Sequence, residues 1–553
     1  MRRLLPLALA ALLALTLLPG LSAIGPIDAR EARDAEIVRE STTGHEWVTP
    51  VYEHQPFFEQ PLFAYAPELA AQRLFARLAT RPADPAAAAG ESRAARSALA
   101  ATLALLVAVI GARAFGARAG WLGGCALAST VGLPLATRAD GGQLLATLAA
   151  WFAIGLLLQV LQGRARAPVA TRWAAWAAIG VAALAGGPLP ALWPVGGFAL
   201  YFALARAHRG WREIRPGLGL LVAAGIALPW YGVMAAIYRG HFLARVPWFP
   251  YATAPRAGGL SGLLMALSYP MVIGWPWSPV LAASLRDTAQ RLGRGGESDL
   301  RDGGHAASLL LCLMVAACVP VALYPRAPLT AALPALPAIA LLCGRFLDRA
   351  LDGDIDPRLL GGATRMAAVL GTALSLLAVV AASRLADAAP GLRLLAATLL
   401  LASWAPLLAD LLGRRKAAAA LFALPIALAM PIVSVRVLPA LEPWLGTRAV
   451  AEAMNAVAPP RAPLVLLEPA PPSLRLLLAR NVVVVRDLAG PLVSEAASDG
   501  NVYAAFPPAL ERDVARTSPA PLEILTRTPT LVLARVGVAP RLDALPAGPA
   551  PAR

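Results

Sequence analysis

The sequence predicts an all-α polytopic membrane protein with a small α/β domain at its C-terminus. Of its 553 residues, 58% are hydrophobic and only 15% are charged, which is too apolar for a soluble protein of this length. Runs of about 20 apolar residues, the length that a helix needs to cross a bilayer, recur along the chain. We expect about thirteen spans, near residues 4–24, 95–115, 119–136, 142–162, 170–186, 188–206, 216–236, 259–283, 306–324, 329–346, 364–383, 392–411 and 417–438.

Basic residues set the expected orientation of these spans. The net charge of +16 suggests either nucleic acid or membrane headgroups as a partner. The basic residues stand singly or in twos and threes between apolar runs, which favours topology determinants over a nucleic-acid surface. The arginine-rich connections are therefore predicted to be cytoplasmic: Arg2/Arg3, Arg113/Arg118, Arg164/Arg166/Arg172, Arg206/Arg209/Arg212, the loop 286–301, Arg345/Arg349/Arg358 and Arg414/Arg415/Lys416. The alternate connections are predicted to face the periplasm or the cell exterior, so the protein is expected in the inner membrane with a cytoplasmic N-terminus.

Three regions are expected. Residues 1–440 form the transmembrane domain, including a first extracytoplasmic loop at 25–94, residues 441–538 form the soluble α/β domain, and residues 539–553 form a disordered Pro/Ala-rich tail. In the soluble domain, strands are expected at 463–468, 482–486, 502–506 and 530–535, with helices near 447–457, 473–480 and 508–516. A cleaved signal peptide over residues 1–23 is the alternative to a first span, and we favour the uncleaved span because the acidic segment that follows needs a tether.

Ionisable residues gather in the first outer loop. Residues 27–43 contain no Pro or Gly and should form a helix on the membrane surface; its charged members are Asp28, Arg30, Glu31, Arg33, Asp34, Glu36, Arg39 and Glu40. Helical spacing presents carboxylates and arginines together on its faces. The spacing alone leaves open a solvated amphipathic helix with i,i+4 pairs.

A second candidate position is Asp140, at the outer end of the third span. A carboxylate there could act as a base toward an acceptor hydroxyl or phosphate. Because Asp140 precedes a helix, an N-cap explains it equally well. Arg245, Arg326 and His241 add positive charge on the same side, and the planar fork of arginine suits phosphate. The combination fits chemistry on a lipid phosphate, and it also fits a polyanion-binding or purely structural surface.

Three segments of the first loop carry a family resemblance. In order and spacing, Glu31 to Glu40 (EARDAEIVRE), Glu46 to Pro50 (EWVTP) and Phe57 to Pro61 (FFEQP) resemble the first outer loop of the GT-C class of membrane glycosyltransferases. The most similar families are the lipid A aminoarabinose transferases and the bacterial protein-mannosyltransferase-like enzymes. Later markers of the family are resembled by Arg138 to Asp140, Pro229-Trp230-Tyr231, Pro276-Trp277 and Leu333 to Pro337, so the resemblance covers residues 25–346.

The resemblance implies a glycosyltransferase that moves a sugar from a polyprenyl-phosphate carrier to a lipid, polysaccharide or protein acceptor on the extracytoplasmic face, by an inverting displacement and without a nucleotide sugar. It implies Glu31 and Asp140 as acidic groups near the acceptor and Arg33 as a contact to the donor phosphate. No cofactor is certain, although Glu59 and His241 resemble residues near a divalent metal ion in some relatives, with an ordinary loop histidine as the alternative. The expected partners are the donor, the acceptor and membrane lipids, and no nucleic acid.

The sequence also departs from that family. Arg30 stands at the family's leading aspartate, so Asp28 would have to take the role of base. Gln60 and Gly186 stand where lysines are usual, and each lost cation costs about 1.5–3 kcal/mol of phosphate binding, which Arg245 or Arg326 could compensate. One alternative is therefore a family member that binds the carrier without catalysing transfer. A transporter or flippase with an outer sensing domain has little support, because few charges lie midway through the spans.

Overall fold

The computed structural model describes residues 4–26, 29–44, 48–78, 85–188, 190–245, 259–292, 303–324, 327–445, 447–459, 462–467, 471–478, 482–485, 501–518 and 522–537. By their contacts the residues form two compact units. One contains Met1–Ala23 and Asp34–Pro439, and the other contains Ile24–Arg33 and Ala440–Arg553.

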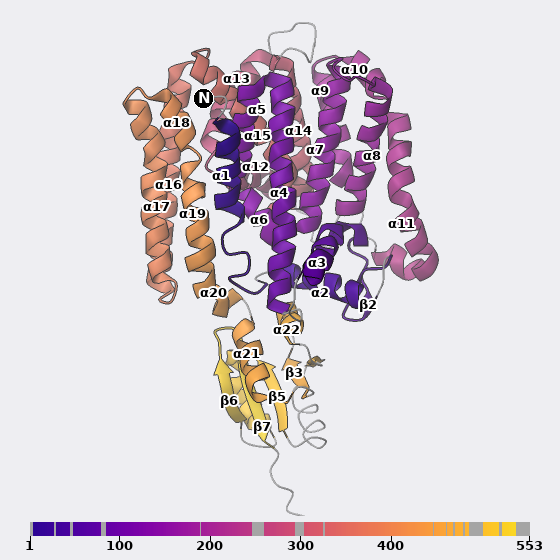
Figure 1. Ribbon diagram of the computed structural model, residues 1–553, viewed down its shortest axis with the longest axis vertical. Helices are drawn as coiled ribbons and strands as arrows, with labels where there is room; N and C mark the ends of the chain where they lie inside the picture. The colour runs from indigo at the N-terminus through magenta and orange to yellow at the C-terminus, as the bar shows by residue number, and fades with distance from the viewer. Residues whose placement is uncertain are drawn as a thin grey trace, which may run out of the picture. The chain divides into compact units, whose positions relative to one another are not determined.

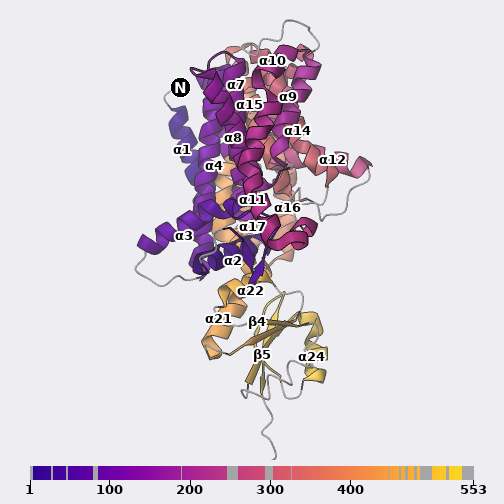
Figure 2. The same ribbon diagram turned by 90° about the vertical axis from the view of Figure 1, so that its right-hand side faces the viewer.

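The first unit is a helical bundle (Figures 1 and 2). Its helices are α1 (Leu5–Leu17), α2 (Ala29–Thr43, which begins in the second unit), α3 (Ala66–Leu78), α4 (Pro85–Phe115), α5 (Ala117–Ala128), α6 (Gly132–Ala139), α7 (Gly141–Leu161), α8 (Pro168–Gly186), α9 (Trp193–Leu204), α10 (His208–Ile214), α11 (Pro216–Arg245), α12 (Gly259–Ile273), α13 (Ser278–Leu292), α14 (Gly303–Leu323), α15 (Leu336–Asp352), α16 (Pro357–Arg384), α17 (Ala389–Leu411), α18 (Arg415–Leu421), α19 (Leu424–Ile432) and α20 (Leu438–Leu445, which ends in the second unit). Short helical turns lie at η1 (Leu62–Tyr65), η2 (Pro190–Leu192), η3 (Leu329–Ala335) and η4 (Val433–Val437), and the strands β1 (Val51–Tyr52) and β2 (Gln55–Pro56) form a hairpin.

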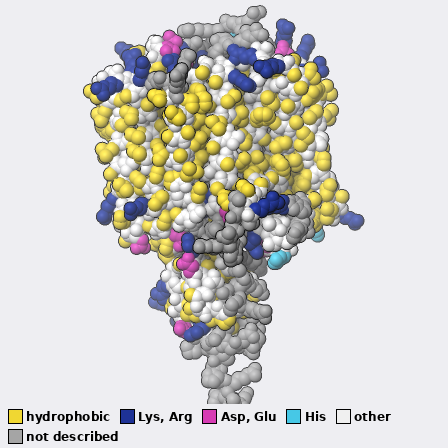
Figure 3. Space-filling model, in the orientation of Figure 1, with side chains coloured by type: hydrophobic (Ala, Val, Ile, Leu, Met, Phe, Trp, Pro, Cys, Tyr) yellow, Lys and Arg dark blue, Asp and Glu magenta, His cyan; other side chains and the backbone are white. Residues whose placement is uncertain are grey.

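The bundle has the dimensions and surface of a multi-pass membrane protein. Among the described residues, nine helical stretches are long and apolar enough to cross a membrane, or ten if the bent pair α5 and α6 is one span. Shorter apolar helices occupy the predicted spans near 4–24, 188–206 and 259–283, so the count of about thirteen spans is not confirmed. A broad band of hydrophobic side chains separates the charged side chains at the two ends of the bundle (Figure 3). Leucines and valines on α16 are exposed within this band, as expected where lipid is the solvent.

The arginine-rich connections that the sequence groups together also meet in space. Arg118 at the start of α5 pairs with Asp348 and Asp352 at the end of α15, and Arg349 pairs with Asp287 near the end of α13. Figures 1 and 2 place α10 at one end of the bundle and α3 at the other. Positive-inside reasoning assigns the arginine-rich end to the cytoplasm, and this orientation remains a prediction.

Helix α15 lies at the centre of the bundle, and small residues let its neighbours approach it. A Cβ atom at Gly344 would lie 2.5 Å from the backbone nitrogen of Gly123 on α5. Such close backbone approach is typical of membrane helix interfaces rich in small residues. Just before α15, the carbonyl of Pro334 accepts a hydrogen bond of 2.9 Å from Nε1 of Trp151 on α7. This contact fixes η3 against α7.

The second unit contains a five-stranded sheet of order β4-β3-β5-β7-β6. Its strands are β3 (Leu464–Leu467), β4 (Val482–Val485), β5 (Asn501–Phe506), β6 (Leu522–Arg527) and β7 (Val532–Gly537), and its helices are α21 (Arg448–Val457), α22 (Pro472–Leu477) and α24 (Glu511–Thr517), which follows the turn η5 (Pro508–Leu510). β3 pairs in parallel with β4 and β5, whereas β7 pairs antiparallel with β5 and β6. Alternate residues of β3, β5 and β7, such as Val465, Ala504 and Ala534, form the core. The predicted small α/β region is therefore present, and β6 is a strand that the sequence prediction missed.

Candidate active site

Most side chains of helix α2 are buried, which corrects the expectation that it is a solvated amphipathic helix. Glu31, Asp34, Glu36 and Glu40 are all buried, as are the apolar residues between them. The structure therefore excludes the solvated amphipathic helix. Carboxylates are seldom buried unless they are paired, so each of them requires a partner in its surroundings.

The partner of Asp34 lies on α4. Nη2 of Arg96 is 3.5 Å from Oδ2 of Asp34, and Nε of Arg96 donates a 2.8 Å hydrogen bond to Oε1 of Glu68 on α3. All three side chains are almost completely buried. Two carboxylates thus share one guanidinium in a region of low dielectric.

Asp140 occupies the N-cap position of α7. Its Oδ1 accepts a 3.0 Å hydrogen bond from the backbone N–H of Gln143, and the Thr330 hydroxyl in η3 lies 3.5 Å from Oδ2. The N-cap interpretation of Asp140 is therefore confirmed. Asp140 is also buried, and the cap holds its carboxylate in one orientation.

Gly141 lets the start of α7, with its cap Asp140, pack against the ion pair of Glu68 and Arg96. A Cβ atom at Gly141 would overlap Oε1 of Glu68 and would lie 2.7 Å from Nε of Arg96. Only glycine lets the first turn of α7 pack on this ion pair. We call the set Asp34, Gln60, Glu68, Arg96 and Asp140 the α7 cluster, because all five surround the start of α7.

Gln60 completes the α7 cluster at the site of an expected lysine. It is buried, and its Nε2 would lie 3.3 Å from a Cβ atom at Gly142. Gly186, the second position where a lysine is usual, is the last residue of α8. It packs against α7, because a Cβ atom at Gly186 would lie 2.7 Å from the Cβ atom of Ala146. Both residues that depart from the family pattern therefore pack against the first two turns of α7. A longer side chain at Gly186 would require Ala146 to shift.

Other predicted site residues are placed as follows. Glu31 and Arg33 lie on α2 within the second unit, where Glu31 is buried and Arg33 is half-buried. Asp28 and Arg326 lie outside the described residues. Arg245 is the last residue of α11, and its side chain lies outside the description. The roles of these residues, and of Asp140, remain predictions.

The two predicted metal ligands lie on segments that contact each other. Phe58, next to Glu59, packs edge to face on Phe242, next to His241, with ring centroids 5.5 Å apart. Glu59 and His241 are both exposed. The described part of the chain contains no group of three or more His, Cys, Asp or Glu side chains that could hold a metal ion. The roles of Glu59 and His241 as metal ligands remain predictions.

Glu68 and Arg96 are the site residues that the sequence analysis missed. A signal for Arg96 was present, since this arginine falls inside the predicted span 95–115, where an ionisable residue is costly and is a functional candidate by default. Glu68 gave no comparable signal. It stands in the first turn of the amphipathic helix α3, where an acidic residue is common.

Replacing Gly141 with alanine is expected to destabilise the first unit by about 1–3 kcal/mol, because the new methyl group would displace the buried Glu68 carboxylate. Gly362→Ala is the matched control, since a Cβ atom there meets nothing within 4 Å. That change on α16 should be neutral or stabilising by up to about 1 kcal/mol. Thermal unfolding of both purified variants in detergent measures the difference. Equal melting temperatures would contradict the packing of Gly141 on Glu68.

Glu40 gives a pH-dependent prediction. Burial is the largest influence on this carboxyl and raises its pKa above the ordinary 4.5, while the backbone N–H of His54, which donates a 3.1 Å hydrogen bond, acts in the opposite direction. A raised pKa means that folding favours the protonated form, so stability is lost as the pH rises above 4.5. Glu40→Gln retains an acceptor for His54 and should melt higher than the wild type at pH 7. The difference should shrink toward pH 4.5, and a constant difference in melting temperature would contradict this prediction.

Three solved structures have a fold similar to that of this chain. ArnT from Cupriavidus metallidurans bound to undecaprenyl phosphate matches with a TM-score of 0.73 and 19% identity over 96% of both chains. The apo state of that protein matches with a TM-score of 0.71, also at 19% identity and 96% of both chains. The apo oligosaccharyltransferase of Archaeoglobus fulgidus matches with a TM-score of 0.50 and 12% identity, over 93% of this chain and 70% of that chain.

Searches by sequence give no such match: no family model and no curated protein matches the chain. ArnT is a lipid A aminoarabinose transferase, and both ArnT and the archaeal oligosaccharyltransferase are GT-C enzymes. At these identities the likeness establishes the fold. The chain has the ArnT-like fold of GT-C membrane glycosyltransferases, as the resemblance in its first outer loop predicted.

Proposed function

We propose that this protein is a membrane glycosyltransferase that moves a sugar from a polyprenyl-phosphate carrier to an acceptor on the extracytoplasmic face. The α7 cluster, in an ArnT-like fold, is the observation that supports this most directly. It places buried carboxylates and an arginine around one helix N-terminus, at the end of the bundle opposite the arginine-rich connections. Buried charged groups are costly, and they concentrate at functional sites in membrane proteins.

The proposed chemistry is a single displacement at the anomeric carbon. The acceptor oxygen forms a bond to this carbon as the bond to the carrier phosphate oxygen breaks, and the carrier phosphate leaves with the electron pair. Asp28, Glu31 or Asp140 accepts the proton of the acceptor hydroxyl. Arg33 stabilises the charge that develops on the leaving phosphate, assisted by Arg245 or Arg326 in place of the missing lysines.

Gln60 favours a second candidate function, a protein that binds the lipid carrier without transferring the sugar. The amide of Gln60 is neutral and buried at the position of a usual lysine, and Ala146 fills the space beside Gly186, the other such position. Both changes remove positive charge near the start of α7. Such losses weaken stabilisation of the leaving phosphate more than they weaken binding of the carrier's isoprenoid chain.

Membranes loaded with a radiolabelled polyprenyl-phosphate sugar distinguish the two functions. A glycosyltransferase should release the label to acceptor in wild-type membranes, with a large loss in Glu31→Gln. Glu452→Gln, which changes an exposed carboxylate on α21, should match the wild type. Retention of labelled carrier by the wild type without any transfer would support the carrier-binding function. If Glu31→Gln, Asp28→Ala and Asp140→Ala all transfer at the normal rate, the site assignment is wrong.

Gln60→Lys tests whether the missing cation limits the reaction. A charged hydrogen bond to phosphate contributes about 1.5–3 kcal/mol, so this variant should transfer about 10- to 150-fold faster if Gln60 faces the donor. Gln60→Met, which changes the length little and adds no charge, is the matched control and should not transfer faster. The measurement is the initial rate at subsaturating donor. An unchanged rate in Gln60→Lys would show that Gln60 does not contact the phosphate.

A further inference from the structure

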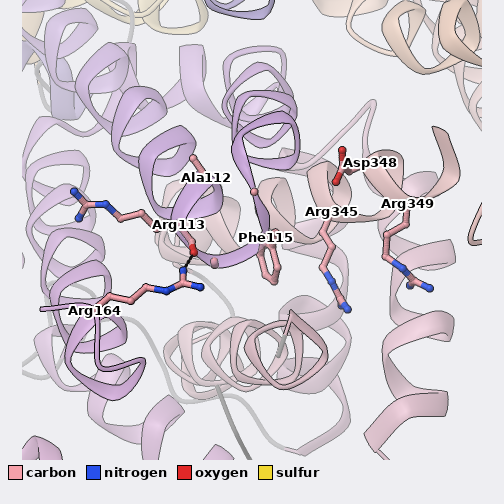
Figure 4. Close-up of a pocket in the computed structure, with 9 residues that line it drawn as sticks. Ala112, Arg113, Phe115, Arg164, Arg345, Asp348 and Arg349 are labelled. Atoms are coloured by element: carbon pink, nitrogen blue, oxygen red, sulfur yellow. Dashed lines mark hydrogen bonds between the residues drawn. The ribbon is translucent and has the colours of Figure 1, made fainter. Parts of the chain in front are cut away.

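A basic pocket lies at the end of the bundle where the arginine-rich connections meet. It has a volume of about 520 Å³ and is bordered by the ends of α4 and α15 and by the residues that follow α7 (Figure 4). Its lining contains four arginines, Arg113, Arg164, Arg345 and Arg349, and a single acidic residue, Asp348. The proposed transfer reaction uses none of these residues.

The charge of this pocket is only partly neutralised. Asp348 pairs with Arg118, and Arg349 pairs with Asp287. Arg113 and Arg164 are exposed, and neither pairs with a carboxylate in the described part of the chain. Arg164 instead donates a hydrogen bond to the backbone carbonyl of Arg113, which holds the two residues together. The pocket therefore presents excess positive charge that a bound anion could neutralise.

A ring orients one arginine of the pocket, and a helix N-terminus adds to its anion-binding character. Phe115 lies between the guanidinium groups of Arg164 and Arg345, and the carbon at the centre of the Arg345 guanidinium is 5.4 Å from the centroid of its ring (Figure 4). Gly116 precedes α5, whose first turn is capped by no side chain, and a Cβ atom at Gly116 would meet nothing within 4 Å. An open helix N-terminus beside arginines favours phosphate.

Helix lengths place this pocket at the opposite membrane surface from the α7 cluster. Arg96 and Phe115 are nineteen residues apart on α4, which corresponds to about 28 Å along the helix, close to the thickness of the hydrocarbon core. α7 spans a similar distance, from the N-cap Asp140 to its end just before Arg164. The pocket is therefore at headgroup level of the other leaflet.

The outer face of α4 shows where the rest of the ligand would lie. Leu105, Val109 and Arg113 follow one another at spacings of four residues, so they share one side of the helix, and all three are exposed. An acyl chain could lie along Leu105 and Val109 while its phosphate reaches Arg113 and Arg164. Inorganic phosphate would make no use of this apolar side.

We propose that this pocket binds the headgroup phosphate of an anionic phospholipid in the leaflet opposite the α7 cluster. Basic pockets between helices at the cytoplasmic side of membrane proteins are suited to such lipids. The arginine-rich connections place the pocket on that side by the positive-inside rule.

The test uses the purified full-length chain in detergent, titrated separately with phosphatidylglycerol, phosphatidylcholine and inorganic phosphate. Lipid retention is measured by native mass spectrometry, and the melting temperature is recorded at each step. Phosphatidylglycerol should be retained and should raise the melting temperature, whereas the other two ligands should have little effect. The double variant Arg113→Gln/Arg164→Gln should bind phosphatidylglycerol about 10- to 30-fold more weakly.

Arg414→Gln/Arg415→Gln is the matched control, because both of these exposed arginines lie in another arginine-rich connection and their loss changes the net charge equally. It should bind phosphatidylglycerol as the wild type does. Equal retention of the two lipids by the wild type, or unchanged binding in Arg113→Gln/Arg164→Gln, would overturn the proposal. Stabilisation by inorganic phosphate equal to that by phosphatidylglycerol would also overturn it. Should the double variant not purify as a single species, the single variants Arg113→Gln and Arg164→Gln decide by the same criteria.

Discussion

Asp140→Asn is expected to reduce sugar transfer by about 10²- to 10⁴-fold while leaving α7 folded. Asparagine is as good an N-cap as aspartate, so the hydrogen bond from the Gln143 backbone, 3.0 Å in the wild type, can be kept. The substitution removes only the negative charge and the ability to accept a proton. The initial rate of transfer from a labelled polyprenyl-phosphate sugar measures the loss of activity. The melting temperature in detergent checks that the protein stays folded.

Two further variants separate the charge of Asp140 from its role as a cap. Asp140→Ala removes both and should lose about 1 kcal/mol of stability in addition to activity. Asp356→Asn is the matched control, since Asp356 caps α16 through the Arg358 backbone at 2.9 Å and lies outside the α7 cluster. It should leave transfer unchanged. If Asp140→Asn transfers at the wild-type rate, Asp140 is a structural cap and the base is another carboxylate.

The apolar framework of this fold could be predicted from the sequence because its signal is local. The apolar run expected at 142–162 forms α7, Gly141–Leu161, and the run at 392–411 forms α17, Ala389–Leu411. Each run begins and ends where polar residues interrupt it, so twenty consecutive residues contain the information. The number of spans does not follow from apolar runs alone, because α1, α9 and α12 are shorter than a full crossing requires although each lies in a predicted span.

The candidate site was harder to predict because its contacts are distant in sequence. Arg96 meets Glu68 across 28 positions, and no periodicity of either helix indicates this pairing. α2 is mostly polar, a pattern that local reasoning assigns to water or to an interface. Its carboxylates are nevertheless buried, and Ile37 and Val38 belong to a core cluster with residues of η1 and α3. β6 was missed for a related reason. It is an edge strand with mostly exposed or half-exposed side chains, so its alternation of apolar and polar residues is weak.

Arg96→Met is expected to destabilise the first unit by about 3–5 kcal/mol, because it leaves the Asp34 and Glu68 carboxylates buried without their shared cation. Methionine fills a similar length of apolar space, so the loss reports on charge more than on packing. The melting temperature in detergent should fall accordingly. A wild-type melting temperature would show that water or another group compensates the two carboxylates.

The triple variant Asp34→Asn/Glu68→Gln/Arg96→Met separates stability from function. Replacing a whole buried ion cluster by neutral groups is often close to neutral in stability, so the triple variant should recover most of the loss caused by Arg96→Met. Transfer should not recover with it, because the charges that surround the start of α7 are then absent. Recovery of both would mean that Asp34, Glu68 and Arg96 only support the fold. Asp140 and Gln60 would then remain as the members of the α7 cluster with a part in the proposed chemistry.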